Sequence, residues 1–141
     1  MKIFVDTSAF YALADEDDRH HSQARDFYSS VIQRFQLVTT DYILVECWFL
    51  MSGRLGRRAA VEFWEGLRLG IVELIKVEPQ DLEKAYQIIR KYHDQELSLV
   101  DATSFAVMER EGIETVFAFD PDFQVYRFGE RNERYFKVVP G

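Results

Sequence analysis

Short hydrophobic runs alternate with helical patterns along the whole chain. Residues 3–5 form a continuous apolar run with β-branched and aromatic members, and Asp6, Thr7 and Ser8 follow it directly. A run of this kind is typical of a strand covered on both faces, as in a parallel sheet flanked by helices. Ligands of such sheets bind outside the carboxyl ends of the strands. We therefore expect the acid and the two hydroxyls to lie at the functional edge of a sheet.

The rest of the chain repeats this alternation. The pattern predicts a helical turn over 9–14, helices over 19–35, 42–51 and 59–69, strands over 36–39, 71–77, 115–119 and 135–139, and helices that open at Pro79 and Ser98. Residues 123–134 follow no regular pattern. Strands that alternate with helices indicate βα units. We predict an α/β fold of three layers, in which a central, mostly parallel sheet of four to five short strands is flanked by helices.

Two of the predicted helices have informative faces. Residues 42–51 are apolar nearly all round, which predicts a helix buried on most sides, and Glu46 is its only charge. In the helix that opens at Pro79, one face is expected to pack on the core. That face carries Leu82, Ala85, Tyr86 and Ile89.

Length and composition narrow the classes of protein. A chain of 141 residues predicts a single domain over residues 1–141, and one cysteine excludes an intramolecular disulfide or a thiolate zinc cluster. The net charge of −7 argues against a protein that coats nucleic acid by bulk charge. We see no secretory signal and no apolar run of membrane-span length, so we expect a cytoplasmic protein without membrane contact.

Four acids lie in surroundings that are unusual for acids, and each has an ordinary explanation. Asp6 follows the first strand, where an aspartate commonly caps the next helix. Asp120 precedes a proline, which is typical of a turn. Asp101 stands three residues after Ser98, which is the spacing of a capping box. Glu46 interrupts an apolar helix, where the ordinary explanation is a buried ion pair with a distant Lys or Arg.

The four acids together favour a metal site. Carboxylates that converge without counter-charge repel each other, and divalent cations remove that conflict. All-oxygen ligation suits Mg²⁺ or Mn²⁺ rather than zinc. Such a site activates water and neutralises charge on a phosphodiester during in-line displacement. We therefore expect the metal-binding and catalytic residues to be Asp6, Glu46, Asp101 and Asp120.

The local sequences around these acids resemble those of PIN-domain nucleases, and most closely the toxin ribonucleases of VapC-type toxin–antitoxin pairs. The matching stretches, in chain order, are FVDTSAF, the lone Glu46 on an apolar helix, SLVDATSFAVM and FAFDPDF. The resemblance spans essentially the whole chain. It implies a PIN-like fold, an Mg²⁺- or Mn²⁺-dependent endoribonuclease acting on RNA, a homodimer, and a co-encoded antitoxin that covers or enters the site.

Hydroxyl groups near the acids are further candidates. Many relatives carry Thr or Ser two residues before the fourth acid, where this chain has Ala118. Thr7, Ser8 and Ser104 are the residues that we expect to supply the missing hydroxyl near the acids.

The fourth metal ligand and the RNA contacts are less sharply defined by the sequence. Asp122 competes with Asp120 for the fourth position, and we favour Asp120 because it ends the strand directly. An acidic protein must obtain phosphate affinity from metal ions and a few placed cations. Arg54, Arg57 and Arg58 are therefore candidates for contacts with RNA.

Two other classes of protein remain as alternatives. One is a non-catalytic PIN-like module that binds a partner protein through its aromatic residues. The other is a phosphate-handling hydrolase or a receiver domain, although Ser8 stands where the hydrolase pattern requires a second aspartate. Retention of all four acids favours the nuclease.

Overall fold

The computed structural model describes every residue from Met1 to Gly141 and contains one five-stranded sheet. The strands are β1 (Lys2–Val5), β2 (Gln36–Thr40), β3 (Val72–Ile75), β4 (Thr115–Phe117) and β5 (Lys137–Val139). They lie in the order β3-β2-β1-β4-β5, and every neighbouring pair is parallel. The predicted α/β fold is confirmed, with a sheet that is parallel throughout.

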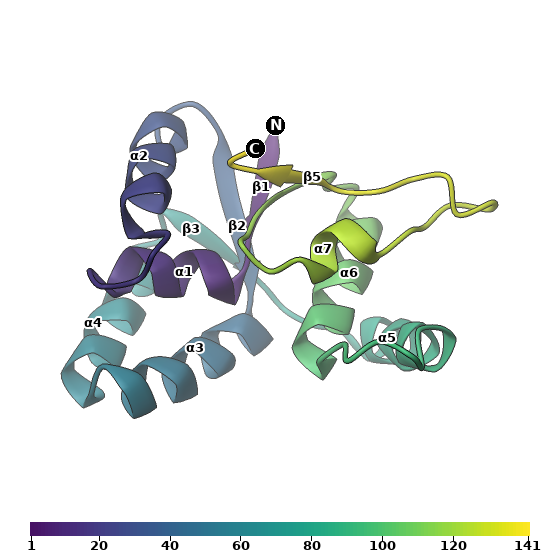
Figure 1. Cartoon of the computed structure of the whole chain (residues 1–141), viewed down its shortest axis with the longest axis horizontal. Coiled ribbons are helices and arrows are strands. Elements are labelled where there is room, and N and C mark those ends of the chain that lie inside the picture. The colour runs from purple at the N-terminus through teal and green to yellow at the C-terminus, as the bar shows by residue number, and fades with distance from the viewer.

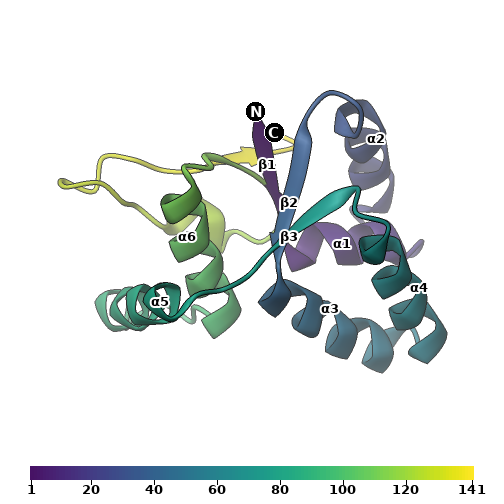
Figure 2. The same cartoon turned by 180° about the vertical axis from the view of Figure 1, so that it is seen from behind.

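Seven helices cover the sheet. They are α1 (Thr7–Ala14), α2 (His21–Val31), α3 (Asp41–Arg54), α4 (Arg57–Arg68), α5 (Pro79–Lys91), α6 (Leu99–Glu111) and α7 (Asp122–Val125). Figures 1 and 2 show α1 to α4 on one side of the strands and α5 to α7 on the other. This arrangement gives the three layers expected for alternating strands and helices. None of the helices combines the length and apolar composition needed to cross a membrane.

The hydrophobic core is one cluster of 32 buried residues. Its centre is the sheet, where Phe4, Val38 and Val116 on three neighbouring strands are all fully buried. On the other side of the sheet from α1, α6 contributes Phe105 and Met108, which are also fully buried. Because β1 is apolar throughout its last three residues, it is the strand that can lie in the middle of the sheet.

Several element boundaries differ from the sequence-based expectation. β4 ends at Phe117 rather than at residue 119, although the Ala118 N–H still donates to the carbonyl of Val139 at 3.1 Å. α2 begins at His21 instead of residue 19, because turns occupy the preceding residues. The segment that showed no regular pattern contains the short helix α7 directly after the fourth acid.

The prediction that α3 is buried on most sides was wrong. Its inner face consists of Ile43, Cys47 and Met51, which are fully buried. On the outer face, however, Val45 is 54% exposed and Phe49 is 73% exposed. Apolar side chains that a folded chain leaves in water on one helix face are typical of a surface that another molecule covers.

The expected inner face of α5 was also wrong in part. Leu82 and Tyr86 are exposed, and the residues that face the core are Asp81, Ala85 and Ile88. Compared with the expected orientation, α5 is rotated about its axis so that Asp81 faces inward, where its carboxylate has hydrogen-bond partners. Its carboxylate accepts the Glu78 N–H at 2.8 Å, which completes a capping box.

A buried ion pair joins α5 to α6. Arg110 donates from Nε and Nη2 to the two carboxylate oxygens of Asp81, each at 2.9 Å, and from Nη2 to the carbonyl of Lys76 at 3.2 Å. This bidentate geometry holds the pKa of Asp81 below its ordinary value, despite the opposing effect of burial. The pair therefore fixes the start of α5 against the end of α6.

We expect replacement of Asp81 by alanine to lower the free energy of unfolding by about 2–4 kcal/mol, because it leaves the Arg110 guanidinium without its partner and removes a helix cap. Urea denaturation followed by circular dichroism measures this change. The control is Glu62→Ala, which breaks an exposed pair with Arg58 and should cost less than about 1 kcal/mol. Equal losses in the two variants would contradict the role of the buried pair.

Candidate active site

The first acid lies where the central strand ends. Asp6 follows β1, its backbone N–H donates to the carbonyl of Phe117 at 3.0 Å, and its side chain caps α1. The cap that sequence reasoning offered as an alternative is thus real, but it uses one carboxylate oxygen only. Oδ2 accepts from the Ser8 N–H at 3.1 Å, while Oδ1 is buried without a hydrogen-bond partner. One oxygen of a buried carboxylate is therefore left for a ligand.

Ser8 connects Asp6 to the neighbouring strand. Its hydroxyl donates to Asp6 Oδ2 at 2.7 Å and accepts the backbone N–H of Phe119 at 2.9 Å. Phe119 directly precedes Asp120, so one hydroxyl fixes the ends of β1 and β4 relative to each other. This bridge orients two of the predicted acids at once.

Asp101 is the third residue of α6, and its carboxylate makes no hydrogen bond to the backbone of the N-cap residue Ser98. The Ser98 hydroxyl accepts the Asp101 N–H at 3.0 Å, but the reciprocal bond of a full capping box is absent. The contrast with α5 is direct, because Asp81 does make that reciprocal bond. The buried carboxylate of Asp101 points instead to the acids at the sheet edge, where its nearest charged neighbours are Asp6, Asp120 and Asp122.

Three of the acids form a compact cluster. Asp101, Asp120 and Asp122 each offer a carboxylate oxygen, and these three oxygens lie within 4.8 Å of one another. The Asp122 N–H donates to Asp120 Oδ1 at 2.9 Å, so the Asp-Pro-Asp sequence folds into a turn that brings both side chains to the same place. The sequence left Asp122 as the less favoured candidate for the fourth position, whereas the folded chain brings it together with Asp120. The signal for its position was the proline, which favours a turn at this point.

Glu46 lies at the edge of this group. It is half-buried on α3, and its charge acts on Asp6. It makes no ion pair and no hydrogen bond with another side chain, so the ion pair considered from the sequence does not form. A carboxylate that is half-buried and unpaired is free to contact a ligand or water.

Burial dominates the electrostatics of the site. It raises the pKa of Asp6 to about 6, with smaller contributions from the charges of Asp120 and Glu46. It raises the pKa of Asp101 to about 9, and the neighbouring acids Asp6, Asp120 and Asp122 add to this shift. The pKa of Asp120 is raised as well, again chiefly by burial. Asp101 therefore keeps its proton at neutral pH unless a cation is present, and the site makes ionisation of Asp6 and Asp120 less favourable than it is in water.

The donor set fits a hard divalent cation. All groups that converge are carboxylates, Asp6 Oδ1 has no partner in the protein, and no lysine or arginine pairs with any of the acids. Oxygen ligands of this kind suit Mg²⁺ or Mn²⁺ rather than zinc. Asp101, Asp120 and Asp122 would hold such an ion, with Asp6 beside them.

The three predicted hydroxyls differ in their hydrogen bonding. Thr7 Oγ1 and Ser104 Oγ are buried and have no hydrogen-bond partner, whereas Ser8 makes two bonds. Of the three candidates to replace the hydroxyl missing at Ala118, Ser8 is therefore the one whose contacts reach the acids.

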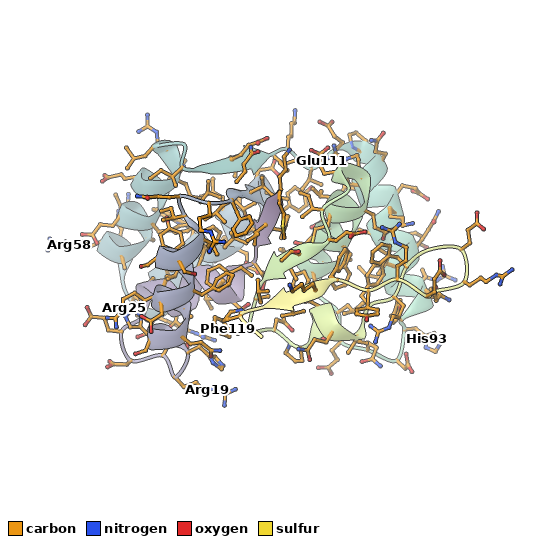
Figure 3. The ribbon with its side chains drawn as sticks, turned by 90° about the horizontal axis from the view of Figure 1, so that it is seen from above. Arg19, Arg25, Arg58, His93, Glu111 and Phe119 are labelled. Carbon is orange, nitrogen blue, oxygen red and sulfur yellow. The ribbon has the colours of Figure 1, made fainter.

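The predicted RNA-contacting arginines lie where α3 ends and α4 begins. Arg54 is eight residues after Glu46, which corresponds to about 12 Å along the helix axis. Its guanidinium lies over the ring of Tyr11, and that of Arg57 lies over Trp48. Arg58 is at the outer edge of the molecule in Figure 3, well separated from the labelled Phe119 beside the acids. The structure does not bring these cations together with the carboxylates.

Comparison with known proteins agrees with this geometry. The sequence profile of the PIN domain family matches residues 3–129. VapC20 of Mycobacterium tuberculosis, a 23S rRNA-specific endonuclease, is 39% identical over 129 residues, which cover 91% of this chain and 96% of VapC20. Ribonuclease VapC26 of the same species is 27% identical over 118 residues, covering 84% and 86% of the two chains.

Solved structures show the same similarity. The crystal structure of VapC20, described as a sarcin–ricin loop cleaving toxin, superposes with a TM-score of 0.81 at 37% identity and covers 87% of this chain and 93% of that one. A toxin–antitoxin complex from Klebsiella pneumoniae superposes with a TM-score of 0.62 at 16% identity, covers 97% and 95% of the two chains, and shows the fold alone. The chain belongs to the PIN-domain family of nucleases, among the VapC-type toxin ribonucleases.

In metal-free protein, we expect the free energy of unfolding to fall as the pH rises from about 5.5 to about 8.5. Asp101 keeps its proton in the folded protein until its raised pKa of about 9, whereas the unfolded chain has lost this proton above the ordinary value of 3.8. The folded state therefore binds more protons across this window, and each such group reduces stability by up to about 1.4 kcal/mol per pH unit. Asp6 acts in the same direction below about pH 6.

Melting temperatures measured in EDTA across this pH range test the expectation. Asp101→Asn cannot ionise at this position, so its melting temperature should depend less on pH and exceed that of the wild type at the upper end of the range. A wild-type profile that is flat, or that rises with pH, would contradict the assignment of protonated carboxyls.

Proposed function

We propose that this chain is an Mg²⁺- or Mn²⁺-dependent endoribonuclease and the toxin of a type II toxin–antitoxin pair. The observation that carries the proposal is the cluster of Asp101, Asp120 and Asp122 within 4.8 Å, beside buried Asp6 and without a counter-charge from the protein. The cluster lies outside the carboxyl ends of parallel strands, where this class of fold binds its ligands. Because its proposed substrate is cellular RNA, we propose a cytoplasmic location for the protein.

Each acid has a distinct role in the proposed reaction. A bound divalent cation supplies Lewis acidity and neutralises charge on the scissile phosphodiester. Asp101, Asp120 and Asp122 hold that ion, and Ser8 keeps Asp6 oriented toward them. Glu46 has neither an ion pair nor a side-chain hydrogen bond, so its carboxylate is the group free to orient the attacking water and to accept its proton.

We expect Asp101→Asn and Glu46→Gln to separate metal binding from proton transfer. Asp101→Asn should lower RNA cleavage by about 100-fold or more and should also remove the rise in melting temperature that Mn²⁺ produces, because a ligand of the cluster is lost. Glu46→Gln should lower kcat by about 10²- to 10⁴-fold and keep that rise. Gel-based cleavage assays and thermal melts with millimolar Mn²⁺ measure both effects.

The control is Glu65→Gln, an exposed glutamate of α4 that should change neither quantity. Wild-type protein that neither cleaves RNA nor melts at a higher temperature with Mn²⁺ would refute the nuclease and would favour the non-catalytic, protein-binding alternative.

Ribosomal RNA is the substrate that we propose to examine first. VapC20, at 39% identity, is a 23S rRNA-specific endonuclease, and its crystal structure is described as that of a sarcin–ricin loop cleaving toxin. The alignment with VapC20 covers 91% of this chain, so it includes the residues that surround the acids as well as the acids themselves. We propose a structured RNA of this kind as the substrate of the chain.

An apolar groove between α1, α2 and α4 is the proposed docking site of the antitoxin. It has a volume of about 420 Å³, and its walls include Phe10, Leu13, Tyr28, Phe63 and Leu67. At its rim, Leu69 is 76% exposed and Ile71 is 53% exposed. A groove of this volume and apolar lining suits the apolar face of an amphipathic helix, which is a common mode of peptide recognition.

The exposed face of α3 is the proposed contact between two copies of the chain. Val45 and Phe49 are neighbours on this face because they lie four residues apart on a helix. Phe49 is the most exposed aromatic residue of the fold, at 73%. Since Glu46 is on the adjacent side of α3, a dimer formed here places two active sites near the same interface.

Two substitutions distinguish the proposed surfaces, and each serves as the control for the other. We expect Phe49→Asp to shift the molar mass in light scattering from dimer to monomer and to leave antitoxin binding intact. Leu69→Asp should instead weaken binding of the antitoxin by about 10-fold or more in calorimetry, because it places a charge in the apolar rim, and should leave the dimer intact. A monomeric wild type, or an antitoxin affinity unaffected by Leu69→Asp, would contradict the corresponding surface.

A further inference from the structure

The segment between α7 and β5, residues 126–136, is anchored in the core at its two ends and projects between them, and we name it the arm. Tyr126, Phe128 and Phe136 are buried, and Figures 1 and 2 show the middle of the segment projecting beyond α6. The arm carries three arginines and two glutamates in a protein whose net charge is −7. It leaves the fold directly after the helix that begins at Asp122, so its base is close to the acid cluster.

The arm has a defined structure of its own. Phe128 and Arg134 exchange two backbone hydrogen bonds of 3.0 Å, which makes the arm an antiparallel hairpin. At its tip, the Glu133 carboxylate accepts the Arg131 N–H at 2.8 Å. Gly129 leaves room for that carboxylate, since a Cβ atom at this position would meet Glu133 at 2.7 Å. The Glu133 carboxylate therefore stabilises the turn at the tip of the hairpin.

Arg127, at the base of the arm, is held in one orientation. Its Nη1 donates to the backbone carbonyls of Gln124 at 2.6 Å and Tyr126 at 3.1 Å. Its guanidinium lies 5.2 Å from the ring centroid of Tyr135, and its backbone N–H donates to the hydroxyl of Tyr92 at 3.0 Å. None of these partners is a carboxylate, and Nε and Nη2 of Arg127 make no hydrogen bond.

This environment differs from that of other fixed arginines in the chain. Arg58, Arg110 and Arg134 each pair with a carboxylate, which belongs to Glu62, Asp81 and Glu114 respectively. Arg127 is fixed by carbonyls and a ring, and its charge is not neutralised. An arginine already held in place loses little side-chain entropy on binding, and its free edge matches the geometry of a phosphate.

The position of Arg127 relative to the acids suits an extended RNA strand. Four residues separate it from Asp122, and three of them belong to α7, so the backbones of the two residues lie about 10 Å apart or less. A strand whose scissile phosphate lies at the acids passes Arg127 within a few nucleotides. Beside it, the ring of Tyr135 is 65% exposed and presents a stacking surface for a base or a ribose.

We propose that Arg127 and Tyr135 form a phosphate-binding subsite for the RNA backbone next to the cleavage site. The subsite rests on the proposed function, because it deepens the account of how an acidic nuclease holds RNA. Arg127 contacts a phosphate through its free edge, and Tyr135 supports the guanidinium and stacks on the adjoining nucleotide. It is a binding contact that carries no base specificity of its own.

The test uses Asp101→Asn protein, which keeps the RNA intact, and a fluorescein-labelled RNA hairpin with the sarcin–ricin loop sequence. We expect Arg127→Ala in this background to weaken binding by about 10-fold in fluorescence anisotropy and to reduce the salt dependence by about one released ion. The loss should be equal for an unrelated hairpin of the same length. Arg127→Lys should keep the salt dependence but recover only part of the affinity, which covers the case in which the alanine variant folds poorly.

The matched control is Arg90→Ala, because Arg90 also lies over a tyrosine ring, that of Tyr86, at 5.8 Å, but on the exposed face of α5. Its affinity for RNA should stay within about twofold of the parent protein. Unchanged affinity and salt dependence in both Arg127 variants, or an absence of RNA binding altogether, would overturn the subsite. So would a loss of antitoxin binding in Arg127→Ala with RNA binding unaffected, since the arm would then belong to a protein interface.

The same proteins distinguish this inference from the proposed function. If wild-type protein cleaves the hairpin and Arg127→Ala binds it with wild-type affinity, the nuclease is supported and the subsite fails. If the wild type binds RNA through Arg127 but does not cleave it in Mg²⁺ or Mn²⁺, the nuclease fails and the subsite is supported.

Discussion

Mutual repulsion between carboxylates at the end of a parallel sheet is the constraint around which this molecule is built. The acids come from three separate places in the chain, namely Asp6, Asp101 and the turn that holds Asp120 and Asp122. Burial makes charge on Asp6, Asp101 and Asp120 more costly than it is in water. The fold holds these groups together nonetheless, through the packing of β1, β4 and α6 around a hydrophobic core. Burial of the hydrophobic core offsets the repulsion between the carboxylates. A cation that binds the folded protein removes part of this repulsion and so raises the free energy of unfolding.

Much of the fold could be predicted because the apolar pattern and the helix caps agree with each other. β1 is apolar and β-branched where it is buried, Thr40 and Ser98 cap the helices that follow them, and Gly112 ends α6 in a left-handed conformation. The faces of α3 and α5 could not be predicted in the same way. Hydrophobicity alone does not tell whether an apolar residue such as Phe49 packs inside its own chain or awaits a partner.

The candidate site was only partly readable from the sequence. Asp6, Asp101 and Asp120 attracted attention because acids are rare after buried strands and on buried helices. Asp122 was undervalued because its position depends on a turn. Contacts of RNA with Arg54, Arg57 and Arg58 stay a prediction, because these arginines lie where α3 ends and α4 begins and do not join the acid cluster. Arg127 gave no signal at all, since its fixed orientation arises from carbonyls and a ring that only the folded arm supplies.

The hydrogen bond from the Phe119 amide to Ser8 has a consequence for synthesis of the protein. The two residues are 111 positions apart, and the contact exists only after β4 has paired with β1. An N-terminal fragment emerging from the ribosome contains Asp6 and Glu46, but it lacks the strand that orients the first and the acids that complete the cluster. The acid cluster therefore assembles only when nearly the whole sequence has been translated.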